Sequence, residues 1–312
     1  MKPVVIKPEK VISGTKYIEN FKFKSRHEVP IYEVTDCSGL NQIIGYIKLI
    51  NKSYGKVFYR GQCDLYDTML PSLYHGNQSL NIMQNKNKRL NKIIINALKD
   101  KKISKETHLK ADDPLSLIVM EGMLQHYGIN TRCIDAIDNH WIGLWFGLNK
   151  YYTERIGNVT YATYTNRMKN CYQLFNDMKI ASEELSSFYQ YLILLAADKK
   201  EENNGVVKGE DLITVDLRVA LPSTFLRPHA QHGVILKKNL HKDNCDFDIS
   251  NNVVGILKIR NDKAQMWLGD GELVKFNNLF PSQFHDYAYR ILLEREDLFN
   301  DGVNSIVQYI YE

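Results

Sequence analysis

A short stretch in the middle of the chain holds most of the side chains that could do chemistry. Between residues 124 and 149 it places an imidazole, a phenol, a guanidinium and a carboxylate, at His126, Tyr127, Arg132 and Asp135. An apolar, aromatic-rich segment follows, and polar groups anchored against a packed element are held in position, as a site requires. This stretch is therefore the first candidate site.

A purely structural explanation fits the same spacing. Gly128 would end a helix and Arg132 would form an ion pair with Asp135, because structural ion pairs produce the same pattern. The apolar segment at residues 141–148 would then be ordinary core.

A second polar group follows a β-favouring run at residues 57–59, where Arg60 is followed directly by Gly61. A guanidinium at a strand end can bind an anion, and a glycine lets a ligand or another backbone approach. The structural alternative is that Arg60 pairs with a nearby carboxylate such as Asp64.

A third polar cluster, residues 227–233, precedes a β-favouring run at 234–236. Its histidines, His229 and His232, lie three residues apart, but no further metal ligand is close to them in sequence. We expect surface histidines or hydrogen-bond partners here and assign no metal.

Residues 84–110 are the most cationic part of the chain, with nine lysine or arginine side chains against two carboxylates. An apolar stripe at helical spacing predicts an amphipathic helix. Its basic face is either a solvated surface or a phosphate-contacting surface for RNA or DNA, with Lys88, Arg89 and Lys92 as contacts. Aromatic side chains do not alternate with these cations, so base stacking is not indicated.

The composition sets wider bounds. A chain of 312 residues, 44% hydrophobic and 24% charged, is ordinary for a globular protein of one large or two smaller domains. The net charge of +4 permits a polyanionic partner without requiring one. Five cysteines without a CxxC pair favour free thiols in a reducing compartment. We see no signal peptide and no membrane-spanning run, so we expect a cytoplasmic protein without membrane contact.

Periodicity and end signals predict the elements that must position these groups. Helices are expected over 40–50, within 84–110, from Pro114 (capped by Asp112 or Asp113) to Gly128, from Asn139 to Leu148, over Ser182 to Ala197, and through most of 281–312. Strands are expected over 3–6, 57–59, 159–164, 212–215, 234–236 and 253–259. A charged loop is expected over 198–209. Glu121 falls on the helix that begins at Pro114.

Four motifs together resemble the FRG-domain family, which is named for a Phe/Tyr-Arg-Gly motif. They are YRGQ at 59–62, LPSLY at 70–74, QHYGINTRCID at 125–135 and RPHAQHGV at 227–234. They span roughly residues 57 to 236 in the family's order. The chain departs from the family after the aspartate, where His140 replaces a proline and Gly143 and Gly147 stand where alanines are common.

The resemblance implies an α+β fold, with a mixed β-sheet core of ADP-ribosyltransferase-like type and several surrounding helices. Residues 1–50 would form an N-terminal extension packed on the core, and residues 51–240 the FRG domain. Residues 241–312 would add a strand and helices that complete the same globule.

The resemblance also implies roles for particular residues. Arg60, with Gly61 beside it, would contact the ribose or diphosphate of NAD, which would be a substrate, and no metal is implied. The nicotinamide side of the pocket would be lined by His126, Tyr127, Thr131 and Arg132. Gln231 would stand in the late motif where many ADP-ribosyltransferases place a glutamate, so we expect Glu121 or Asp135 to supply the carboxylate.

Three functions follow as hypotheses. The first is an NAD-dependent ADP-ribosyltransferase acting as a bacterial toxin or phage-defence effector, with RNA or protein as acceptor and an antitoxin or regulatory protein as partner. The second is a non-catalytic module that binds nucleic acid or a protein partner. The third is a nuclease using Glu121, Asp135 and a histidine, which ranks last because no paired-carboxylate metal motif is visible.

Overall fold

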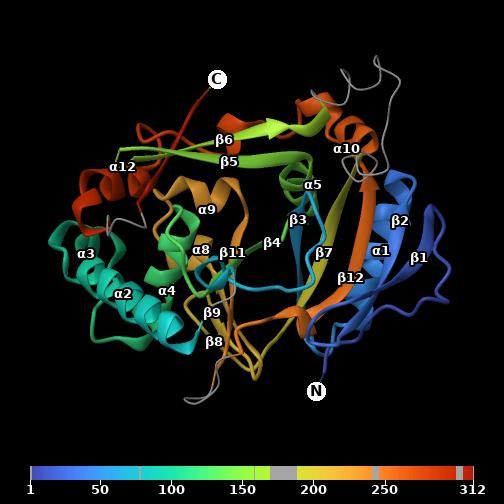
Figure 1. The fold of residues 1–312 in the computed structure, drawn as a ribbon, viewed down its shortest axis with the longest axis horizontal. Helices are drawn as coiled ribbons and strands as arrows, with labels where there is room; N and C mark the ends of the chain where they lie inside the picture. Colours follow the sequence, from blue (N-terminus) through green and yellow to red (C-terminus); the bar gives the residue numbers. More distant parts are fainter. Residues whose placement is uncertain are drawn as a thin grey trace.

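The computed structural model describes residues 2–76, 79–157, 159–168, 188–240, 246–299 and 305–311. A ten-stranded sheet runs through the middle of the molecule (Figure 1). Its strands, in order across the sheet, are β1 (Thr15–Lys22), β2 (Glu28–Val34), β12 (Val253–Arg260), β7 (Tyr189–Asp198), β3 (Gly55–Gln62), β4 (Cys133–Ile137), β11 (Gly233–Lys238), β10 (Leu212–Asp216), β9 (Val206–Lys208) and β8 (Glu201–Asn203).

The sheet is mixed, because β12 pairs parallel with β2 while the neighbouring pairs are antiparallel. Strands come from the first 50 residues, from the middle and from beyond residue 240. The expected α+β class with a mixed sheet is therefore confirmed.

The sheet consists of two halves that meet at a narrow seam between β3 and β4. The ladder between β3 and β7 runs the full length of β3, from Gly55 to Gln62. In the described ladder between β3 and β4, by contrast, Tyr59 opposite Ile137 is the single pair. Backbone groups on either side of that pair lack a strand partner across the seam, which leaves room for side chains there.

Helices cover one face of both halves and build two cores. The half that carries β3 is covered by α1 (Cys37–Ile50), α5 (His140–Leu148), α10 (Asn261–Trp267) and α11 (Phe276–Leu279). The half that carries β4 is covered by α2 (Leu80–Lys99), α3 (Lys101–Thr107), α4 (Pro114–His126), α8 (Leu217–Ala220), α9 (Leu226–Ala230) and α12 (Tyr287–Glu294). On the opposite face a third cluster spans the seam, with Phe58 of β3 among Ile134 and Ala136 of β4.

A small second sheet lies across one end of the large one (Figure 1). It is made of β5 (Asn149–Ile156), β6 (Val159–Asn166) and β13 (Val307–Tyr309). Tyr164 of β6 and Tyr309 of β13 pack with Phe276 and Phe280 of the α11 region in one aromatic cluster. These rings fix the small sheet to the half that carries β3.

Several predicted helix ends are confirmed. Asp113 caps α4 by accepting from the backbone N–H groups of Leu115 and Ser116, and Gly128 follows α4 with φ +101°. Asn139 caps α5. In the described parts of the chain, no helix is both long enough and apolar enough to cross a membrane.

Other predictions are wrong. The helix expected over 182–197 is strand β7 from Tyr189 onward, and residues 182–187 lie outside the described residues. This apolar run is central in the sheet and buried on both faces, a pattern that periodicity cannot distinguish from a buried helix. Residues 3–6 form no strand, 198–209 carry the β8–β9 hairpin, and 15–34 form the β1–β2 hairpin that we did not predict. The tail beyond 281 contains α12, but also β13.

Candidate functional site

Asp135, on β4 beside the seam, is the centre of a polar cluster. Its Oδ2 accepts a hydrogen bond of 2.8 Å from the Gln125 side-chain amide. The orientation of that amide is fixed, because Thr131 donates to the Gln125 Oε1 at 2.7 Å and itself accepts from the Cys133 backbone N–H. Gln125 is therefore held with its N–H toward the carboxylate. We call Arg60, Gln125, His126, Thr131 and Asp135 the Asp135 site.

The second oxygen of Asp135 is not used by a hydrogen bond. Its Oδ1 lies 3.7 Å from Nδ1 of His126 and has no hydrogen-bond partner among the described residues. The Asp135 side chain is 42% exposed as a whole, although its Oδ1 is itself buried. Burial raises its pKa, but the nearby His126 imidazole, together with Gln125 and Arg60, holds the pKa below its ordinary value. The carboxylate is thus ionised and incompletely paired.

Arg60 reaches across the seam to the backbone of Asp135. Its Nη1 donates a 2.7 Å hydrogen bond to the Asp135 carbonyl oxygen, and so replaces part of the missing strand ladder. Among the described residues it pairs with no carboxylate, so the expected alternative partner Asp64 is not used. Burial lowers the pKa of Arg60, an effect that Asp135 partly opposes. An arginine remains charged all the same, and most of its donors stay available to an anion.

Gly61 has a packing role in this structure. A Cβ at this position would overlap the carbonyl oxygen of Gly143 on α5. One turn on, a Cβ at Gly147 would overlap the side chain of Gln190 on β7. Of the two explanations for Gly61, close approach of another backbone is the one observed.

Three tyrosines of the small sheet lie within electrostatic range of Asp135. Burial raises the pKa values of Tyr151, Tyr164 and Tyr309, and the negative charge of Asp135 adds to the rise in each. Tyr151 and Tyr164 lie ring to ring at 5.1 Å, and Tyr151 is 43% exposed. Tyr151 is therefore an exposed aromatic ring that senses the charge of Asp135.

Glu121 and Arg132 form a closed ion pair instead. Arg132 donates to both Glu121 oxygens, at 2.8 and 2.7 Å, and adds a backbone N–H bond of 3.0 Å. Lys237 on β11 donates a further 2.7 Å bond, and the Glu121 side chain is 1% exposed. Burial raises the pKa of Glu121, but Lys237 and Arg132 outweigh it and lower the value to about 2. The expected pairing of Arg132 with Asp135 is wrong.

Tyr127 also lies in the core. It is fully buried, and its hydroxyl donates a 2.7 Å bond to Asp286. The guanidinium of Arg227, buried as well, lies 4.4 Å from the Tyr127 ring centre and 4.5 Å from that of Tyr289. Its Nη1 approaches the His126 carbonyl oxygen at 3.4 Å. This arrangement supports the backbone of His126 from behind.

The 227–234 motif packs against the ring of His126. Gln231 is buried, and its side-chain amide donates to the Leu279 carbonyl oxygen at 2.8 Å. Two residues on, Gly233 lies against the His126 ring, where a Cβ would come within 2.8 Å of Cε1. Residues near 60, 130 and 231 therefore come together at the seam. The side chain of Gln231 itself, at the end of α9, is held by its hydrogen bond to Leu279 of α11.

The basic helix is α2, and its predicted contacts Lys88, Arg89 and Lys92 are exposed. The apolar stripe expected on it, Leu90, Ile93, Ile94, Ala97 and Leu98, is buried. Among the described residues the three cations form no ion pair. This surface is available to solvent or to a phosphate-bearing partner.

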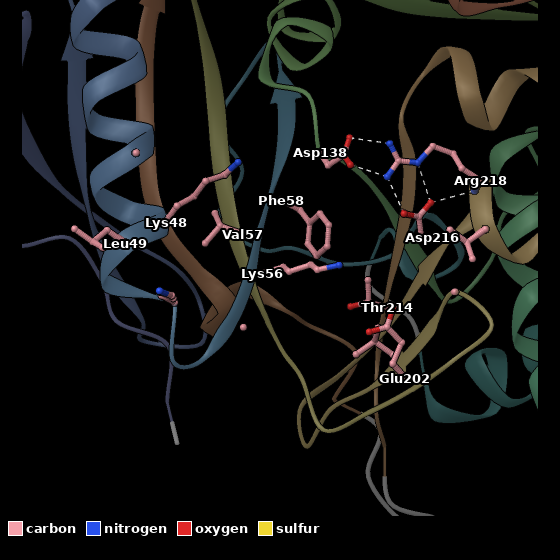
Figure 2. Close-up of a pocket in the computed structure, with 16 residues that line it drawn as sticks. Lys48, Leu49, Lys56, Val57, Phe58, Asp138, Glu202, Thr214, Asp216 and Arg218 are labelled. Atoms are coloured by element: carbon pink, nitrogen blue, oxygen red, sulfur yellow. Dashed lines mark hydrogen bonds and ion pairs between the residues drawn. The ribbon is translucent and has the colours of Figure 1, made fainter.

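A cleft of about 770 Å³ opens on the other side of the Tyr59–Ile137 pair (Figure 2). It is lined by α1 and β3 on one side and by β9, β10 and α8 on the other, and the residues that we predicted for the site do not line it. Asp138 in its wall bonds Arg218 at 2.6 Å and His232 at 2.9 Å, and Arg218 also bonds Asp216. We call this cleft, with Lys48, Lys52 and Lys56 on its α1–β3 side, the lysine cleft.

Sequence analysis missed several of these residues. Gln125 stands next to His126 in the motif, and its amide beside two charged residues was the available signal. Lys237, Tyr151 and Asp138 carried no local signal, because each acts through partners distant in sequence.

The family comparison agrees with the three motifs between residues 59 and 135, while the 227–234 motif lies outside the matched range. The FRG-domain family model matches residues 55–155, and this is the family that the motifs were predicted to resemble. That range includes Arg60, Glu121 and the whole 125–135 motif. Among curated proteins and among solved structures, nothing matches the chain.

Proposed function

We propose that the chain is an NAD-dependent ADP-ribosyltransferase and that the Asp135 site is its catalytic centre. The observation that carries this proposal is the Arg60 guanidinium bonded across the seam to the Asp135 backbone, beside a carboxylate whose Oδ1 has no hydrogen-bond partner among the described residues. ADP-ribosyl transfer needs a cation for the diphosphate and an anion near the ribose, and this site offers both.

The chemistry assigns a task to each group. Breaking the bond between nicotinamide and ribose C1′ sends the electron pair to the nicotinamide and leaves positive charge on the ribose. Asp135, ionised and partly exposed, would stabilise that charge, while Arg60 would bind the diphosphate. Gln125 and Thr131 fix the direction of the carboxylate. The exposed Tyr151 ring offers a stacking surface for the nicotinamide.

The acceptor completes the transfer. Its nucleophile bonds to C1′ and gives up a proton, for which Asp135 or His126 is the adjacent base. An RNA acceptor would find phosphate contacts at Lys88, Arg89 and Lys92 on α2. Such an activity in a bacterium would act as a toxin or phage-defence effector and would need an antitoxin or other regulatory protein.

Nicotinamide release from NAD tests the proposal. We expect the purified chain to release nicotinamide and to label RNA or protein with ADP-ribose. Asp135→Asn should lower the rate at least ~100-fold, the effect of removing one preorganised electrostatic group. The matched control is Asp262→Asn, an aspartate in an exposed pair with Arg260. No release by the natural chain, or an undiminished rate in Asp135→Asn, would refute the proposal.

The exposed cations of α2 also favour a second function, a non-catalytic RNA-binding module. That function predicts RNA binding that weakens steeply with salt and is insensitive to NAD. Replacing Lys88, Arg89 and Lys92 together by alanine should then abolish binding, whereas Asp135→Asn should leave it unchanged.

A further inference from the structure

The lysine cleft has charges that its own residues do not balance. Figure 2 shows Lys48 and Lys56 on the α1–β3 side, facing Asp138, Asp216, Arg218, Thr214 and Glu202 on the other. Asp138 and Asp216 share the one cation of Arg218, and Glu202 pairs with Lys199 at 2.7 Å, so these three carboxylates leave one negative charge against the three lysines.

The lysines have no such partners. Among the described residues Lys48, Lys52 and Lys56 form no ion pair within 4 Å, although the charge of Lys56 helps to lower the pKa of Glu202, and Lys48 lies 5.1 Å from the centre of the Tyr59 ring. Three ammonium groups on one wall of a cleft attract a ligand that carries more than one negative charge. A phosphate chain is the common biological group of that kind.

A buried hydroxyl in the cleft also lacks a partner. Thr214 on β10 lines the cleft and is 5% exposed, and its Oγ1 has no hydrogen-bond partner in the described structure. Buried polar atoms are nearly always hydrogen-bonded, so an unused hydroxyl in a cleft wall indicates a polar atom of a bound molecule. This observation is independent of the lysines.

The remaining lining residues suit the apolar part of a small-molecule ligand. Apolar side chains contribute to both walls, with Leu49, Val57 and Phe58 on the α1–β3 side and Val207 and Val219 on the opposite side. A volume of about 770 Å³ lies within the range of small-molecule sites, which combine apolar walls with a few polar groups.

We propose that the lysine cleft binds a nucleoside phosphate, at a site separate from the Asp135 site. Lys48, Lys52 and Lys56 hold the phosphates, the apolar wall contacts the base or sugar, and Thr214 bonds one polar atom of the ligand. The proposal does not depend on ADP-ribosyl transfer. It adds a second ligand on the far side of the Tyr59–Ile137 pair.

Calorimetric titration of the full chain tests this site, with ADP, ATP and GTP as probes and with pyrophosphate and adenosine as the two separate halves. We expect at least one nucleotide to bind more tightly than either half. The double variant Lys52→Ala, Lys56→Ala should weaken that nucleotide at least ~10-fold, because it removes two phosphate contacts. The matched control, Lys88→Ala with Lys92→Ala on α2, removes the same charge from another surface and should leave affinity within ~2-fold.

Gly45 provides a steric test that does not change charge. It lines the cleft on α1, and a Cβ there meets nothing within 4 Å. Gly45→Phe should therefore block the nucleotide, while Gly45→Ala and Arg60→Ala should bind it normally. The proposal is overturned if none of the nucleotides binds at millimolar concentration, or if the α2 control loses as much affinity as the cleft variant. Loss of binding in Arg60→Ala with normal binding in the cleft variants would also overturn it, by placing the ligand at the Asp135 site.

Discussion

Glu121 and Asp135 are two carboxylates of the same motif region with opposite surroundings. Glu121 is 1% exposed and bonded by Arg132 and Lys237, whereas Asp135 is 42% exposed with Oδ1 unbonded. Both have lowered pKa values, so both are ionised at neutral pH. A perturbed pKa therefore does not separate a structural carboxylate from a chemical one here, but unused bonding capacity does.

The residues around Glu121 and Asp135 fall into the same two groups, closed and open. Arg132 and Tyr127 belong to the closed side, where each has a buried partner. Arg60, Gln125 and His126 surround Asp135 on the open side. The expected nicotinamide-side residues thus fall into two groups, and Arg132 and Tyr127 gain a structural role that the motif did not reveal.

Glu121→Gln should cause the largest loss of unfolding free energy. It leaves Arg132 and Lys237 partly buried without their counter-charge, and breaking a buried ion pair costs about 3–5 kcal/mol. Thermal and urea unfolding would measure the loss. A change below about 1 kcal/mol would contradict the closed description of this region.

Lowering the pH should reduce the free energy of unfolding by nearly as much as Glu121→Gln does, because it protonates the same carboxylate. The folded pKa of Glu121, about 2, lies below its ordinary value of 4.5, so the group stabilises the fold above pH 4.5. That contribution, on the order of 3 kcal/mol, is lost as the pH falls from about 5 toward 2. Unfolding free energies measured across that range should fall in the natural chain. A fall equally steep in Glu121→Gln would assign the effect to other groups.

Gly61→Ala should have an intermediate effect, because the added methyl meets the α5 backbone at Gly143. Overpacking of this kind costs about 1–3 kcal/mol, and more where backbone must move. Gly45→Ala is the matched control, since its Cβ meets open space. Unchanged stability in Gly61→Ala would restore the alternative in which Gly61 serves the approach of a ligand.

Asp135→Asn should have the smallest effect on stability. Its remaining carbonyl oxygen can still accept from Gln125, so we expect a loss of less than about 1 kcal/mol. The same variant carries the largest predicted effect on nicotinamide release. Destabilisation comparable to Glu121→Gln would show that Asp135, too, is mainly structural.

Local signals predicted much of this fold. Asp113 and Asn139 as helix caps and Gly128 as a stop all act within a few residues of themselves. The failure at β7 has a physical cause, because a strand buried on both faces loses the alternation that identifies strands.

The site was predictable only in part. The motifs identified Arg60 and Asp135 as candidates. They did not show that the contact between these residues bridges a seam with a single strand pair. Nor did they show that Arg132 pairs with Glu121, since Lys237 completes that cluster from a strand over 100 residues away. The contact between His126 and Gly233 links two motifs, and only the tertiary structure displays it.

The most direct measurement is a crystal structure of the Asp135→Asn variant with NAD, which should slow turnover while preserving the shape of the site. We predict the diphosphate on Arg60, ribose C1′ facing residue 135, and the nicotinamide against Tyr151. NAD bound only in the lysine cleft, or contacting neither Arg60 nor residue 135, would contradict the assignment of chemistry to the open carboxylate.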